Sequence, residues 1–137
     1  MKELKKIPSG HEKVAFEREI EVQSSLNHPN CLKLFGRSIN PTNGHPILVM
    51  QVCNDGCLTD YIIKHTKPHL SKEDKCRIIL EIAQGLAYLH SLGFIHRDLK
   101  LDNILMHNGH PVIADFGLSR KIDMQHSMQI TFAGSPV

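Results

Sequence analysis

The stretch FIHRDLKLDN, residues 94–103, places a histidine, an arginine, two aspartates, a lysine and an asparagine within ten positions. A core could not bury so many polar groups without partners, and a surface loop has no need of them. Asp98 can accept a proton or orient a hydroxyl group. Lys100 can neutralise phosphate charge, and Asn103 offers a neutral oxygen that suits a hard cation such as magnesium.

A second polar group follows the stretch at a short distance along the chain. Asp115 lies 12 residues after Asn103 and is followed by Phe116 and Gly117, a glycine that lets the backbone turn close to a ligand. A hydroxyl-orienting carboxylate, a lysine and two oxygen ligands for magnesium are typical of phosphoryl transfer, which depends on positioning and charge stabilisation.

The bulk composition sets limits on the class of protein. A length of 137 residues allows one domain, and 41% hydrophobic with 22% charged residues is ordinary for a soluble globular chain. The formal charge of +2 does not predict nucleic-acid binding. No apolar run has the length of a membrane span, so no membrane partner is expected. The four cysteines form no paired CxxC pattern, which favours a reduced, cytoplasmic setting.

Periodicity and turn signals predict an α+β series of elements. Ser71, with Asp74 three residues later, resembles a capping box and predicts the start of the longest helix. The segment from Asp115 onward shows no periodicity and is predicted to be irregular. The expected elements are a helix at 11–26, a hairpin of strands at 31–39 and 46–52, helices at 57–65 and 72–91, and short strands at 103–107 and 111–114.

The sequence HRDLKLDN at 96–103, followed by DFG at 115–117, closely resembles the catalytic loop and magnesium motif of eukaryotic protein kinases. This resemblance implies an incomplete, two-lobed kinase fold that uses ATP and magnesium to phosphorylate protein substrates. It further implies that Asp98 is the catalytic base and that Lys100 contacts the transferred phosphoryl group. Asn103 and Asp115 are then the magnesium ligands.

The resemblance continues on both sides of this loop. It makes Met50 the gatekeeper residue, the residue at the back of the adenine site. Lys2 takes the place of the nucleotide-binding lysine, although a solvated lysine without that role stays an alternative. Cys57 falls at the lip of the nucleotide cleft, where it is either a reactive thiol or an ordinary one. The residues implied to bind the nucleotide are Lys2, its partner Glu19, the backbone of Gln51 and Cys53, Cys57, Leu105 and Asp115.

The C-terminal segment TFAGSPV resembles an activation segment. Thr131 takes the place of an activation phosphosite, and a phosphate there could pair with Arg97, which implies an upstream activating kinase. Ser135 takes the place of the residue that contacts the catalytic Asp and Lys. Lys100 and the Gly-Ser-Pro sequence favour serine/threonine over tyrosine specificity.

The chain also departs from the family pattern. The resemblance runs from the end of the lysine-bearing strand to the activation segment, so we expect a truncated domain: residues 1–50 as a remnant of the N-lobe, 51–57 as the hinge and 58–137 as a partial C-lobe. The helix at 72–91 is then expected to expose apolar surface.

Gln23 stands where the family usually has an apolar residue stacked on the phenylalanine of DFG. An unpaired amide there would cost about 1–3 kcal/mol, unless it reaches a backbone group or water. Two functions stay open: a serine/threonine kinase, or a catalytically incompetent chain that binds nucleotide or protein.

Overall fold

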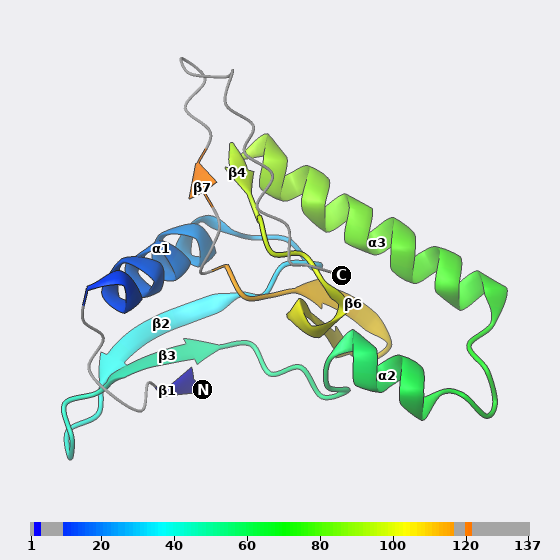
Figure 1. The fold of residues 1–137 in the computed structure, drawn as a ribbon, viewed down its shortest axis with the longest axis horizontal. Coiled ribbons are helices and arrows are strands. Elements are labelled where there is room, and N and C mark those ends of the chain that lie inside the picture. Colours follow the sequence, from blue (N-terminus) through cyan, green and yellow to red (C-terminus); the bar gives the residue numbers. More distant parts are fainter. Residues whose placement is uncertain (1, 4–9, 117–119, 122–137) are drawn as a thin grey trace.

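The computed structural model describes residues 2–3, 10–116 and 120–121 of the chain (Figure 1). Helices and strands alternate irregularly along the sequence, as expected for an α+β chain. The elements are β1 (Lys2–Glu3), α1 (His11–Ser25), β2 (Leu34–Ile39), β3 (Pro46–Met50), α2 (Leu58–Lys64), α3 (Lys72–Ser91), β4 (Phe94–Ile95), η1 (Leu101–Asn103), β5 (Ile104–His107), β6 (His110–Ile113) and β7 (Arg120–Lys121).

The first half of the chain forms an antiparallel sheet of order β1-β3-β2 with α1 beside it. In the turn between β2 and β3, the amide of Asn40 donates a hydrogen bond to the carbonyl of His45 at 2.8 Å. The antiparallel pairing of the two strands confirms the predicted hairpin. Helix α1 lies along β2 (Figure 1). It buries Phe16 and Val22, and Leu26 directly after the helix is buried as well.

The second half contains α2, α3 and the β5–β6 hairpin, which lies between the two helices (Figure 1). Ser71 caps α3 as predicted: its Oγ accepts from the amide of Asp74 at 3.0 Å and donates to Oδ2 of Asp74 at 2.8 Å. Asn108 and Gly109 form the two-residue turn of the hairpin with φ of 51° and 77°, values typical of a type I′ turn.

Two apolar clusters hold these elements together. The smaller cluster joins α2 and α3 to β5 and consists of Leu58, Ile78, Ile104 and Met106. The larger one joins the two halves of the chain, because its members come from α1, the segment before β2, α3, β4, β6 and the segment after β6. It consists of Val22, Leu26, Cys31, Leu32, Leu89, Phe94, Val112, Ile113, Ala114 and Phe116.

The segment before β2 is tied to both α3 and β6 by backbone contacts. The carbonyl of Asn30 accepts from the amide of Ile113 at 2.8 Å, and the amide of Leu32 donates to the carbonyl of Ile113 at 2.9 Å. Gly85 of α3 packs here so closely that a Cβ atom would lie 3.0 Å from the Asn30 carbonyl. A glycine is therefore required for α3 to approach this segment.

The structure differs from the sequence-based prediction mainly at short elements. The strands β4 and β7, of two residues each, pair antiparallel and were not predicted, so the interpretation of everything after Asp115 as irregular was wrong at 120–121. The predicted strand at 31–39 begins at Leu34, with Cys31 in an isolated bridge to Ile113. Among the described residues, no helix is both long and apolar enough to span a membrane.

Candidate functional site

His96 fixes the start of the loop at 96–103 from inside the core. Its side chain is buried, and its ring lies 5.4 Å from that of Phe116, centroid to centroid. The amide of Asp98 donates to Nδ1 at 3.2 Å, so Nδ1 carries no proton and Nε2 donates to the carbonyl of Ala114 at 2.7 Å. A neutral histidine therefore links the backbone of the loop to the backbone that precedes Asp115.

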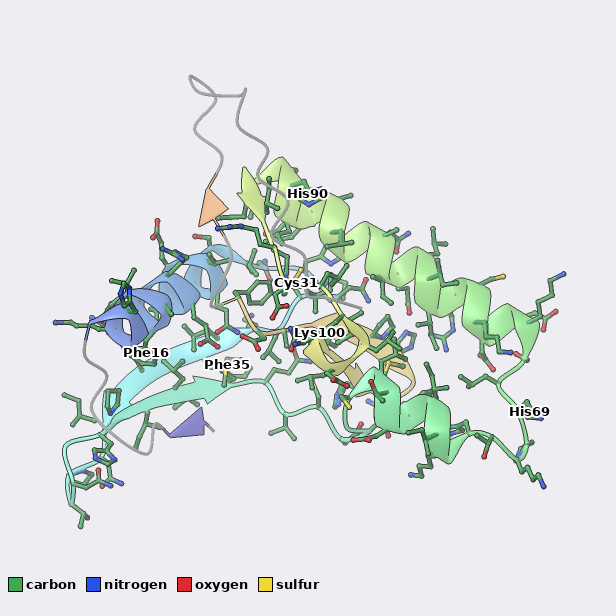
Figure 2. All side chains as sticks on the ribbon, viewed as in Figure 1. Phe16, Cys31, Phe35, His69, His90 and Lys100 are labelled. Carbon is green, nitrogen blue, oxygen red and sulfur yellow. The ribbon has the colours of Figure 1, made fainter. Side chains whose placement is uncertain are left out.

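Asp98, Lys100 and Asn103 lie together, as the resemblance implied. The Nδ2 of Asn103 donates to the backbone carbonyl of Asp98 at 2.8 Å and to its Oδ2 at 3.1 Å. The Nζ of Lys100, labelled in Figure 2, lies 3.8 Å from the same Oδ2, and the Lys100 side chain is 46% exposed. The carboxylate of Asp98 is thus held by two neighbours in its own loop, one of which reaches solvent.

The side-chain oxygen of Asn103, Oδ1, is left for another partner. The side chain is buried, and both of its described hydrogen bonds are donated by Nδ2. Within the described residues, Oε1 of Gln23 is the only side-chain oxygen or nitrogen that is fully buried without a partner. Oδ1 of Asn103 accepts no hydrogen bond from the described residues, so it is free to bind a hard cation.

Asp115 is placed next to Asn103 by the backbone. The amide of Ala114 donates to the backbone carbonyl of Asn103 at 2.9 Å, and Asp115 follows directly with an exposed side chain. Asp115 has φ of 58° and Arg97 has φ of 71°, in the left-handed region that is rarely occupied by residues other than glycine. Such backbone strain clusters at functional sites.

Asn103 and Asp115 together fit a magnesium ion. Both offer oxygen, the ligand type that magnesium prefers, and this ion is commonly held by one or two protein oxygens together with substrate phosphates and water. Within the described residues, no cluster of three or more His, Cys, Asp or Glu side chains could hold a metal without such help.

The backbone groups predicted to contact adenine, at Gln51 and Cys53, lie in the segment that follows β3, and their contacts with adenine stay predictions. The amide of Gln51 donates to the carbonyl of Lys33 at 2.9 Å, so this residue is tied to the segment before β2. The amide of Cys53 has no acceptor among the described residues. Burial raises the pKa of the Cys53 thiol.

Cys57 and Leu105 lie opposite each other in an isolated antiparallel bridge. Cys57 occupies the N-cap position of α2, as predicted. Its Sγ donates to Oδ2 of Asp60 at 3.3 Å, so the thiol proton already has a partner. Leu105 packs against the larger apolar cluster. Nucleotide contacts at either residue stay predictions.

Glu19 and Gln23 lie one turn apart on α1, and both side chains are buried. Lys2 lies in β1 with its Cα paired to Leu48 of β3, as expected for the end of a strand, but its side chain is outside the described part of the chain. The predicted Lys2–Glu19 pair therefore stays a prediction. Gln23 reaches Met50 instead of a backbone group: its Nε2 donates to Sδ at 3.7 Å.

Two anchors of the site were missed in the sequence. Asn30 is buried, and its Nδ2 donates to the carbonyl of Pro111 at 2.9 Å. Asn54, after β3, exchanges two hydrogen bonds with Asn108: Nδ2 donates to Oδ1 at 2.9 Å, and the Asn108 amide donates to Asn54 Oδ1 at 3.0 Å. For the second anchor, the sequence offered only the turn-forming pair Asn108 and Gly109, which predicts the turn but not the contact with Asn54.

The predicted regulatory residues Thr131 and Ser135 lie outside the described residues. Arg97, the expected partner of a phosphate on Thr131, is described and half-buried. Its role in binding a phosphate stays a prediction.

Comparisons with known proteins agree with the geometry. Residues 1–135 match the family model described as protein tyrosine and serine/threonine kinase. A probable serine/threonine-protein kinase of Dictyostelium discoideum is 44% identical over 124 residues, which is 88% of this chain and 7% of that protein. NUAK family SNF1-like kinase 2 of Rattus norvegicus is 38% identical over 133 residues, 96% of this chain and 20% of that protein.

Serine/threonine-protein kinase PLK4 of Xenopus laevis is 33% identical over 120 residues, 86% of this chain and 12% of that protein. The chain thus spans between 7% and 20% of the length of these relatives. It belongs to the protein tyrosine and serine/threonine kinase family, with a partial kinase fold of α+β class.

Proposed function

We propose that this chain supplies the catalytic loop and the magnesium ligands of a protein serine/threonine kinase, which transfers the γ-phosphate of ATP to protein hydroxyl groups. One observation carries the proposal: Nδ2 of Asn103 is fixed on Asp98, Oδ1 accepts no hydrogen bond from the described residues, and the backbone of Asn103 is bonded to Ala114, the residue before Asp115. Two of the relatives, those of Dictyostelium discoideum and Xenopus laevis, are named as a probable and as a serine/threonine-protein kinase, which supports the choice of substrate class.

The residues of the loop divide the work by their positions. Asp98 orients the attacking hydroxyl and accepts its proton, because its carboxylate is held by Asn103 and has Lys100 at 3.8 Å. Lys100 is exposed enough to reach the transferred phosphoryl group and neutralise its charge. Positioning by such groups is the main contribution of a protein to phosphoryl transfer.

Asn103 and Asp115 would hold magnesium through Oδ1 and the carboxylate. When bound, the ion supplies charge neutralisation at the phosphate oxygens. Gln51 and Cys53 would bind adenine through a backbone carbonyl and a backbone amide, with Leu105 and Cys57 beside it. Glu19 would orient Lys2 toward the phosphates.

Thermal unfolding with and without Mg-ATP tests the proposal. A ligand that binds only the folded chain raises the midpoint, by about 2.7 kcal/mol of stability at a concentration 100 times Kd. We expect the shift in the unmodified chain and its loss in Asp115→Asn. ATP with excess EDTA should give a smaller shift, because the two oxygen ligands act through the metal.

Asp102→Asn is the matched control for charge. Asp102 lies beside Asn103 and accepts from Oγ1 of Thr59 at 2.6 Å, a bond that an asparagine oxygen would keep. This variant should respond to Mg-ATP like the unmodified chain. Equal losses in Asp102→Asn and Asp115→Asn would contradict the assignment of Asp115 as a ligand. Binding without phosphate transfer to a protein substrate would favour the alternative, a nucleotide-binding chain without catalysis.

Further parts of the proposal rest on the family and on sequence. An upstream kinase that modifies Thr131, pairing of that phosphate with Arg97, and contact of Ser135 with Asp98 and Lys100 belong to it. So does a location in the cytoplasm, where the four cysteines would stay reduced.

A further inference from the structure

Gln23 carries the one side-chain oxygen or nitrogen that is fully buried without a hydrogen-bond partner in the described part of the chain. It is 1% exposed, and its Oε1 has no donor. Its Nε2 has only the sulfur of Met50, at 3.7 Å, and a thioether is a weak acceptor. Buried amides in folded proteins normally have full partners, so this site carries a cost that needs an explanation.

Because Gln23 belongs to α1, the free-energy cost of its unpaired oxygen weakens the packing of this helix in particular. The neighbouring Val22 belongs to the larger apolar cluster, and Met50 of β3 packs against the same cluster. An apolar side chain of similar length would fill this place without leaving an oxygen unpaired. Glu19 lies one turn earlier on the same helix, so whatever holds Gln23 also holds Glu19.

We infer that Gln23 is a positioning residue that weakens the docking of α1 on the core, while its amide bond to Met50 selects the docked position. The helix is thereby held by a specific but weak contact, and it can move away from β3 at low cost. Outward movement would expose Oε1 to water and satisfy it. The consequence for Glu19 and the nucleotide rests on the proposed kinase function; the docking itself does not.

Hydrogen exchange of the 137-residue chain, followed by mass spectrometry without ATP, tests this inference. Gln23→Met keeps the length of the side chain and removes the unpaired oxygen. We expect exchange of the α1 amides to slow about tenfold in this variant, with much less change in α3. Gln84→Met is the matched control, because Gln84 is an exposed glutamine within α3 and the same change there should leave both helices unaltered.

Met50→Leu tests the sulfur contact. It removes the only described acceptor of Nε2, so exchange of α1 should quicken in the unmodified background and change little in the Gln23→Met background. Equal effects in both backgrounds would overturn the role of the contact. Unchanged or faster exchange of α1 in Gln23→Met would overturn the inference, as would an unmodified chain in which α1 shows no protection. Because ATP is absent, none of these results depends on phosphate transfer.

Discussion

Gly85→Ala is the substitution whose effect the structure defines most sharply. Gly85 is a buried residue within α3, where alanine should favour the helix by about 1 kcal/mol. The added Cβ would lie 2.9 Å from Cδ1 of Ile113, 3.0 Å from the carbonyl oxygen of Asn30 and 3.1 Å from its Cβ. The gain in helix propensity therefore competes with a steric clash.

Neither neighbour can move away without further loss. Ile113 is 0% exposed in the larger cluster, and the Asn30 carbonyl accepts from the Ile113 amide at 2.8 Å. Overpacking of a tight core costs about 1–3 kcal/mol or more. Because the Cβ would meet both a backbone carbonyl and a fully buried side chain, the cost should lie in the upper part of this range, at about 2–3 kcal/mol. After subtraction of a propensity gain of about 1 kcal/mol, the net loss should be about 1–2 kcal/mol, which corresponds to a fall of about 4–7 °C in Tm for a chain of this size.

Urea and thermal unfolding, followed by circular dichroism, measure this loss. Gly36→Ala is the control: it is the same change in β2, where a Cβ would meet nothing within 4 Å. We expect Gly36→Ala to keep or raise the stability of the chain. If Gly85→Ala were as stable as the unmodified chain, the close approach of α3 to Asn30 and Ile113 would be wrong.

Three further predictions follow from individual side chains. The hydrogen bond from Ser71 lowers the pKa of Asp74 in the folded chain, so ionised Asp74 stabilises the fold. This contribution to the free energy of unfolding is complete above the pKa of the unfolded state and is lost as the pH falls through the pKa of the folded state. In Ser71→Ala, acid titration of stability should show a smaller loss over this pH range. Burial raises the pKa of Cys31 to about 12, so mass spectrometry of alkylated protein should find exposed Cys76 modified first and Cys31 only after unfolding. Leu80 is 58% exposed, so Leu80→Glu should reduce self-association on gel filtration without lowering Tm, whereas a large loss of Tm would show that Leu80 is buried.

Local signals in the sequence predicted most of the fold. The capping pair at Ser71 and Asp74 and the turn at Asn108 and Gly109 depend on residues within four positions of each other. The missed pair of β4 and β7 has two residues in each strand and joins Ile95 to Arg120. Two residues carry no periodicity, and such a pairing depends on the tertiary structure around it.

The candidate site was predictable where its residues are close in sequence. Asp98, Lys100 and Asn103 lie within six consecutive residues of one loop and contact each other there. Their residue types and spacing were enough to predict the kind of chemistry they could perform. The anchors were not predictable, because Asn30 meets Pro111 across 81 positions and Asn54 meets Asn108 across 54. A lone asparagine before a strand does not indicate its distant partner.

A site residue can be held in place by its own side chain, as Asn103 is, or by the backbone, as Asp115 is. This difference decides which variant tests chemistry and which tests folding. Asn103→Ala would remove both hydrogen bonds to Asp98 and disturb the loop, so loss of Mg-ATP binding would have two causes. Asp115 differs, because its place is set by the backbone bond between Ala114 and Asn103, and its own side chain is exposed. Asparagine tolerates the left-handed φ of 58° at Asp115 as well as aspartate does. Asp115→Asn should therefore unfold at the same temperature as the unmodified chain without ligand, and only its response to Mg-ATP should change.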